Sequence, residues 1–86
     1  MTDEQVYVVL IEDRHADVEV HVFRTADAAV AYAEFMWNAN IDDDGRLNPD
    51  LDMMTPDELQ RAGWLFYRCY SVEGDCVRAM PVAVDD

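Results

Sequence analysis

The side chains in this sequence that most often carry out chemistry are two cysteines and two histidines. A nucleophilic cysteine needs a base nearby, and small cysteines on strands more often serve as core residues. Cys69 and Cys76 have neither the spacing of a metal site nor the redundancy of a disulfide framework. His15 and His21 lack the i, i+4 spacing of a zinc site on a helix. We therefore predict no catalytic residue and no enzymatic activity, with both cysteines as free thiols in a reducing compartment.

The most acidic stretch, residues 40–52 (NIDDDGRLNPDLD), resembles the calcium-binding loop of EF-hand proteins. With Gly45 at the glycine of that motif, the resemblance implies a calcium ion held by the side chains of Asn40, Asp42, Asp44 and Asn48. Leu51 stands where the motif has a bidentate Glu, and Pro49 interrupts the start of the exit helix. Two interpretations follow, a calcium site or a solvated acidic loop with an Asp-Gly turn. No other cofactor is indicated.

The net charge is the strongest feature of the composition. Nineteen acidic residues face six basic ones, all of them arginine, which gives a net charge of −13 at pH 7. Direct binding to nucleic acid or to an anionic membrane is disfavoured because phosphate would be repelled. A basic protein surface would be attracted, and its approach accelerated. The alternative is that the acidity is an adaptation to salt or to solubility and serves no partner.

One long helix is predicted over residues 25–37, because Thr25 can cap its start and alanines fill its interior. It has two apolar faces, separated only by a narrow polar stripe. The second face, which carries Tyr32 and Phe35, either lies under loops of the chain or meets another protein. Together with the charge, this pattern predicts a partner-binding surface made up of Tyr32, Glu34, Phe35, Asp42, Asp43, Asp44, Asp50 and Asp52.

Two strands are predicted before the helix. Residues 6–12 are apolar on both alternating faces, which is typical of a central strand. Residues 18–23 alternate, with Val18, Val20 and Val22 on one side. The polar residues 13–17 form the turn between these strands, and their Asp-Arg-His run is interpreted as solvated rather than catalytic.

A short helix and two more strands are predicted after residue 52. Thr55, Pro56 and Glu58 are typical of a capping box with proline at the first helical position, and Gly63 ends the helix. Residues 64–72 and 76–84 form strands joined by a turn at residues 73–75. A tight turn centred on Gly74 would not place the two cysteines opposite each other, so a disulfide is doubtful. Pro81 predicts that the last strand lies at a sheet edge or ends its pairing there.

The order of elements predicts an α+β fold in a single domain over residues 1–86. We expect a four-stranded, mainly antiparallel sheet with the helices on one face. The opposite face would be uncovered and partly apolar, and a homodimer or a docking partner would cover it. The candidates for this uncovered face are Tyr7, Val9, Ile11, Phe23, Phe66, Tyr70 and Met80.

Residues 6–34 (VYVVLIEDRHADVEVHVFRTADAAVAYAE) resemble small uncharacterised domains of prokaryotes and their phages, which begin with a hairpin, a Phe and an Ala-rich helix. The resemblance implies an accessory or phage-encoded protein that works by binding. No run of residues reaches the length of a membrane span, and the N-terminus has no signal-peptide pattern. We therefore expect a cytoplasmic binding module that inhibits a nucleic-acid-binding protein by mimicking DNA. The alternatives are a calcium-binding protein and a salt-adapted protein of other function.

Overall fold

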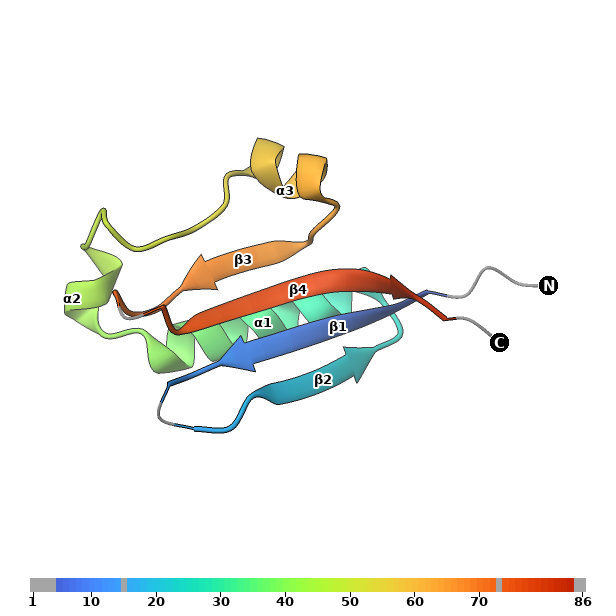
Figure 1. Cartoon of the computed structure of the whole chain (residues 1–86), viewed down its shortest axis with the longest axis horizontal. Coiled ribbons are helices and arrows are strands. Elements are labelled where there is room, and N and C mark those ends of the chain that lie inside the picture. Colours follow the sequence, from blue (N-terminus) through green and yellow to red (C-terminus); the bar gives the residue numbers. More distant parts are fainter. Residues whose placement is uncertain (1–4, 15, 73, 85–86) are drawn as a thin grey trace.

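The computed structural model describes residues 5–14, 16–72 and 74–84. The elements along the chain are β1 (Gln5–Glu12), β2 (Glu19–Phe23), α1 (Ala26–Asn40), α2 (Asp43–Arg46), α3 (Pro56–Ala62), β3 (Phe66–Cys69) and β4 (Cys76–Ala83). The strands form one antiparallel sheet in the order β2-β1-β4-β3 (Figure 1). The predicted α+β class and four-stranded antiparallel sheet are confirmed.

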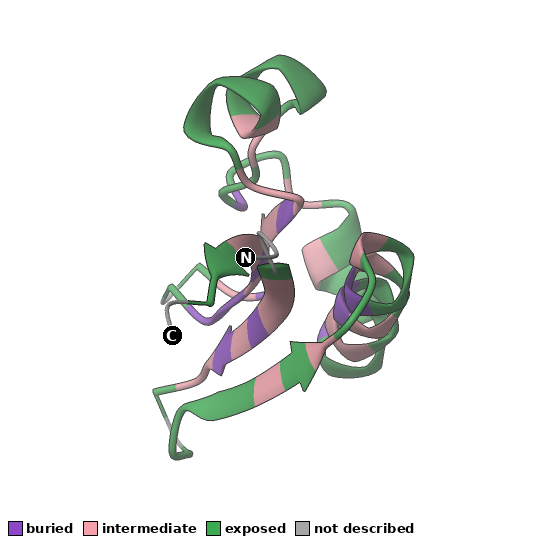
Figure 2. Ribbon diagram, turned by 90° about the vertical axis from the view of Figure 1, so that its right-hand side faces the viewer, coloured by how far each residue is buried: buried purple, intermediate pink, exposed green. Residues whose placement is uncertain are grey.

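Helix α1 covers one face of the sheet, and the core lies between them (Figure 2). Ala29 and Ala33 on α1 are fully buried. Their small side chains let the helix approach the central strands closely, where Val9 of β1 and Val77 of β4 are also fully buried. Position 9 pairs with residues 21 and 79, so the same face carries His21 and Ala79.

The predicted N-terminus of α1 is confirmed, but the helix runs three residues further than expected. The Thr25 hydroxyl accepts a hydrogen bond from the backbone N–H of Ala28 at 3.2 Å. At the other end the side chain of Asn38 donates to the carbonyl of Glu34, and that of Asn40 donates to the carbonyl of Met36. Of the four last carbonyls, which have no partner within the helix, that of Trp37 accepts from the N–H of Ile41 at 3.0 Å and that of Asn38 accepts from the guanidinium of Arg46 at 3.2 Å.

The stretch at residues 40–52, expected to lack secondary structure, contains the short helix α2. Asp42 caps it by accepting a hydrogen bond from the N–H of Gly45 at 2.6 Å. The prediction was wrong because the acidic residues were assigned to a solvated or calcium-binding loop. Aspartate at an N-cap and in the first turn also favours a helix.

Helix α3 begins and ends as the sequence indicates. The Thr55 hydroxyl accepts from the N–H of Glu58 at 3.2 Å, and the Glu58 carboxylate accepts from the N–H of Thr55 at 3.1 Å. Gly63 follows with φ of 75°, a left-handed conformation that favours glycine. The helix has no buried residue and lies beyond the β3 side of the sheet, so α1 provides the cover for the core-bearing face (Figures 1 and 2).

Pro81 lies on a central strand, because β4 pairs with both β1 and β3. The expectation that this strand lies at a sheet edge is therefore wrong. The alternative, that pairing of the strand ends at Pro81, is correct only on the side of β3. The last β3–β4 pair is Phe66 with Ala79, and the carbonyl of Ala79 accepts from Leu65. Backbone groups two residues apart point to the same side of a strand. The nitrogen of Pro81 therefore faces the side on which β3 has already ended.

The sheet face opposite α1 is uncovered and largely apolar. We call it the open face and define it by Val6, Val8 and Leu10 of β1, Val20 and Val22 of β2, and Met80 and Val82 of β4. Of the residues expected there, only Met80 belongs to it. The other six lie on the α1 side as parts of the core or against it: Tyr7, Val9, Ile11, Phe23, Phe66 and Tyr70. The expected residues of β1, β2 and β3 were thus assigned to the wrong face, and that of β4 to the correct one.

The two tryptophans lie on opposite sides of the sheet. Trp37 belongs to α1, and its ring N–H donates to the carbonyl of Cys69 at 3.0 Å. Trp64 packs against Tyr67 with ring centroids 5.7 Å apart, and the guanidinium of Arg78 lies 5.5 Å from its ring centre. No helix among the described residues is long and apolar enough to cross a membrane.

Candidate functional site

Seven of the exposed carboxylates lie on one segment, residues 42–58, which we call the acidic segment. It leaves the end of α1 through α2, runs along the outer side of β3 and ends in the first turn of α3 (Figure 1). All of its acidic residues are exposed, namely Asp42, Asp43, Asp44, Asp50, Asp52, Asp57 and Glu58. The five aspartates predicted for partner binding are thus all exposed on this segment.

Backbone hydrogen bonds hold the acidic segment against β3. The N–H of Cys69 donates to the carbonyl of Asp52 at 2.8 Å, and the N–H of Met54 donates to the carbonyl of Tyr67 at 3.1 Å. Met53 and Arg68 form an antiparallel bridge between these two bonds. The segment thus satisfies the outer edge of β3 and is anchored there, while its carboxylates stay in water.

No ion pair neutralises the acidic segment within the described part of the chain. The guanidinium of Arg46 donates to the side-chain and backbone oxygens of Asn38 and also lies 5.5 Å from the ring centre of Trp37. The guanidinium of Arg68 lies over Trp37 and Phe66. Arg46 and Arg68 therefore contact amide oxygens and aromatic rings and do not neutralise the carboxylates. The electrostatic potential around the acidic segment stays negative.

The helix residues predicted for partner binding separate into two groups. Tyr32 is half-buried, and its hydroxyl lies 3.1 Å from Nε2 of His21 in a hydrogen bond. Its ring also packs on Phe23 at a centroid distance of 5.3 Å. Glu34 and Phe35 point outward, with Phe35 66% exposed. Tyr32 is thus part of the packing between α1 and β2, and only Glu34 and Phe35 remain on the free surface.

Three of the four candidate calcium ligands line one cavity of about 250 Å³, namely Asp42, Asp44 and Asn48. Asn40 is not part of its lining. Two of the three already bond to the chain, because Asp42 caps α2 and the side-chain oxygen of Asn48 accepts from the N–H of Asp50 at 2.9 Å. Gly45 has no positive φ and lies inside α2, whereas the glycine of an EF-hand loop makes a sharp turn. Calcium binding stays a prediction.

The cysteines form a disulfide, which corrects the expectation of free thiols. Cys69 and Cys76 are paired directly in the sheet register. Their side chains lie under the Tyr67 hydroxyl, which is 3.8 Å from Cys69 Sγ and 3.7 Å from Cys76 Sγ. A bonded pair has no thiolate, so neither cysteine is a nucleophile in this state.

A polar network at the turn ends of β1 and β3 was missed from the sequence. Asp75 is buried, and its two carboxylate oxygens accept from the N–H of Arg14 at 2.7 Å and the hydroxyl of Ser71 at 2.8 Å. The Tyr70 hydroxyl donates to Asp13 at 2.8 Å. Burial and the Asp13 carboxylate raise the pKa of Tyr70, so it remains a donor. The network therefore ties the turn after β1 to the turn after β3.

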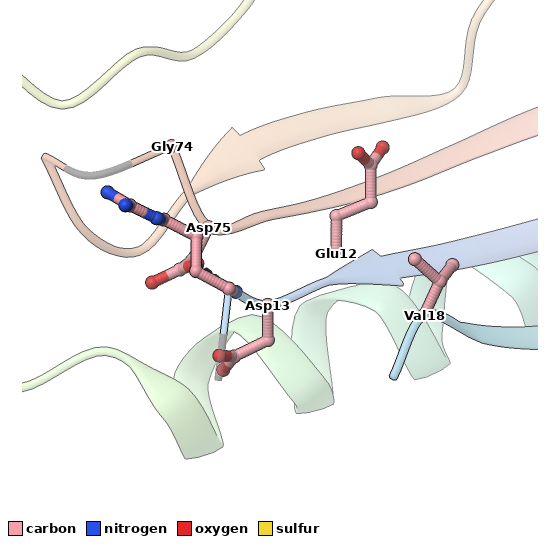
Figure 3. Close-up of a pocket in the computed structure, with 6 residues that line it drawn as sticks. Glu12, Asp13, Val18, Gly74 and Asp75 are labelled. Carbon is pink, nitrogen blue, oxygen red and sulfur yellow. Dashed lines mark hydrogen bonds between the residues drawn. The ribbon is translucent and has the colours of Figure 1, made fainter. Parts of the chain in front are cut away.

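A small cavity of about 220 Å³ lies beside this network and is lined by Glu12, Asp13, Arg14, Val18, Gly74 and Asp75 (Figure 3). The network joins Tyr70 to Asp13 and Asp75 to Arg14, residues that lie 57 and 61 positions apart in the sequence. No local sequence pattern could therefore indicate it. His15 and residue 73, which the sequence placed in the two neighbouring turns, lie outside the described residues.

Comparison with known proteins gives no relative. No family model matches the chain, and neither a curated protein nor a solved structure matches it. The resemblance of residues 6–34 to prokaryotic and phage domains therefore stays a prediction.

Proposed function

We propose that this protein is a small non-catalytic binding module whose acidic segment engages a basic protein surface. The partner class is a nucleic-acid-binding protein, and the segment occupies its phosphate-binding surface as a mimic of the DNA backbone. The observation that supports this proposal best is the run of seven exposed acidic residues between positions 42 and 58, none of them in an ion pair within the described chain.

The position of the acidic segment suits this role. It lies outside the sheet and the core, anchored to β3 through backbone bonds, and its carboxylates are exposed to a partner. Three of them, on Asp42, Asp52 and Glu58, also accept hydrogen bonds from the chain. A duplex presents a dense row of negative charges, and proteins that bind it use Arg and Lys to neutralise them. A surface selected for phosphate would meet carboxylates here, and attraction over several ångströms would speed the encounter.

The proposal includes the cellular compartment in which the protein acts. An accessory or phage-encoded inhibitor would act in the cytoplasm, where nucleic-acid-binding proteins work. The cytoplasmic location stays a prediction, and the disulfide between Cys69 and Cys76 removes the support that free thiols would have given it.

The test is retention of basic proteins by the immobilised protein. A pool of nucleic-acid-binding proteins purified on heparin is applied at low salt and eluted with a rising salt gradient. We expect proteins to be retained at low salt and released as salt screens the charges. Each retained protein should then lose binding to a labelled DNA duplex when the acidic protein is added. Retention of no basic protein at low salt would contradict the proposal.

Two variants that each lose three negative charges distinguish binding by the acidic segment from an effect of net charge alone. The first combines Asp43→Asn, Asp44→Asn and Asp50→Asn. The control combines Asp17→Asn, Glu19→Gln and Asp27→Asn, which are exposed residues outside the segment. We expect the first variant to elute at clearly lower salt and the control to elute like the unmodified protein. Equal shifts in both would show that only net charge matters.

Calcium binding is the second candidate function, and the shared cavity of Asp42, Asp44 and Asn48 favours it. Calcium takes oxygen ligands at six or more positions, so these side chains would need backbone carbonyls and water beside them. Calorimetry with millimolar calcium decides the matter, with Asp44→Asn as the variant that should remove any heat. Absence of heat and of a change in melting temperature would exclude this function.

A further inference from the structure

The open face is a contiguous apolar surface on the side of the sheet away from α1. Val8 of β1 lies between Val22 of β2 and Met80 of β4, and Leu10 lies beside Val20. Val20 and Val22 are 57% and 61% exposed. Monomeric proteins rarely expose large contiguous apolar patches, and such patches mark interaction sites.

The charge of this face distinguishes it from the rest of the molecule. On the open side of the described strands the only charged side chains are Glu12 and Arg78, and they form an ion pair with each other. The face therefore contributes no net charge in a chain whose total is −13. Two copies that approach along their acidic surfaces repel, whereas two copies that approach face to face bring neutral surfaces together.

The size of the face suits a reversible contact. Strands about 4.8 Å apart with a rise of about 3.3 Å per residue give β1, β2 and β4, which carry the open face, a footprint of roughly 330 Å². A standard interface buries about 800 Å² of accessible surface on each partner, and accessible surface exceeds a flat footprint because side chains are corrugated. The open face is thus smaller than a standard interface, and this size fits a weak, reversible dimer.

We propose that the open face is a self-association surface on which a second copy of this chain packs. The two sheets stack about 10 Å apart, as in a β-sandwich. A two-fold axis passes near Val8 and Met80, which pair on the two central strands, so that each copy contributes the same residues. This surface is separate from the acidic segment, so the proposal does not depend on the proposed function.

The alternative surface for a second copy is the outer side of α1, where Phe35 is 66% exposed. That surface is smaller, because Tyr32 packs on β2, and exposed Glu34 adds negative charge. Between the two, the open face offers more apolar area and less repulsion.

Sedimentation equilibrium of the full chain over a salt series tests the proposal. We expect a monomer–dimer equilibrium that strengthens between about 0.02 and 0.5 M NaCl, because screening removes the repulsion between the copies. Val22→Lys should raise the dimer dissociation constant at least about tenfold, since the dimer would bury an unpaired charge. This substitution lowers the net negative charge, so weaker association cannot come from greater overall repulsion.

Phe35→Lys is the matched control, with the same change of charge on the α1 side, and it should leave the dimer intact. Circular dichroism and the melting temperature report whether each variant folds, and both positions are exposed in the single chain. A monomer at 0.5 M salt and high protein concentration would overturn the proposal. A dimer that Phe35→Lys dissociates, or one that neither variant weakens, would overturn it equally.

Discussion

Cys69 and Cys76 are paired directly across β3 and β4, and a disulfide joins them at the turn end of the two strands. The bond closes a short loop of chain that contains Tyr70, Ser71 and Asp75. Three of the hydrogen-bonding groups of the polar network therefore lie inside a covalent ring, and the strand pair that carries them cannot separate at this end.

Reduction of this disulfide should lower the free energy of unfolding. The chain-entropy estimate for a loop of this length is about 2.5 kcal/mol, because the reduced unfolded chain regains freedom. Urea denaturation with and without dithiothreitol measures the difference. Alkylation followed by mass measurement is the control, with no cysteine modified before reduction and two after it. Two alkylated cysteines in the unreduced folded protein would contradict the bond.

Asp75→Asn should destabilise the protein by about 1.5–3 kcal/mol, because the amide loses a charged acceptor for two donors in a buried position. The NH2 group of the substituted side chain is itself a donor, so it would face one of these two donors without forming a hydrogen bond. Asp17→Asn, an exposed change of the same chemistry, should stay within about 0.5 kcal/mol of the original. Urea midpoints of the two variants provide the measurement, and equal midpoints would mean that the Asp75 bonds contribute little.

Acidification should weaken the start of α3. Hydrogen bonds from Thr55 lower the pKa of Glu58 below its ordinary value of 4.5. A carboxylate with a depressed pKa stabilises the folded form above its unfolded pKa, and this contribution is lost as the pH falls through the lower folded value. The protection factors of the first α3 amides, which are hydrogen-exchange rates corrected for the intrinsic effect of pH on exchange, should fall between pH 6 and pH 3. Glu58→Gln keeps an acceptor for the Thr55 N–H and should remove this pH dependence.

Tyr32→Ala and Phe35→Ala should differ strongly in stability although both remove an aromatic ring from α1. Tyr32 packs on Phe23 and His21, so its loss should cost about 2–4 kcal/mol. Phe35 is mostly in water, and its loss should stay within about 0.5 kcal/mol. Thermal unfolding of both variants measures the stability that each substitution removes. A large loss for Phe35→Ala would show that this ring is covered by something other than the single chain.

The features predicted correctly are those that neighbouring residues determine. Thr25 and the Thr55–Glu58 pair cap their helices through bonds three residues apart, and Gly63 ends α3 by its own backbone preference. Alternation in β2 correctly separated Val20 and Val22 from His21. In the acidic segment the positions of the carboxylates were also predictable, since exposed aspartate needs no tertiary partner.

The features predicted wrongly depend on register between distant residues. The turn between β3 and β4 begins at Ser71, two residues earlier than expected, and this shift places Cys69 opposite Cys76. The pattern of β1 shows that both of its faces are apolar, but not which of them meets α1. Tyr70 and Asp13 bond across 57 residues, a pairing that becomes visible only when the sheet order is known.

The placement of the two tryptophans gives the protein an optical reporter on each side of its sheet. Trp37 contacts Arg46 of α2 and therefore responds to events at the acidic segment. Trp64 packs with Tyr67 and Arg78 beside the open face and responds to events there. Fluorescence titrations would follow partner binding through Trp37 in the variant Trp64→Phe, and self-association through Trp64 in the variant Trp37→Phe.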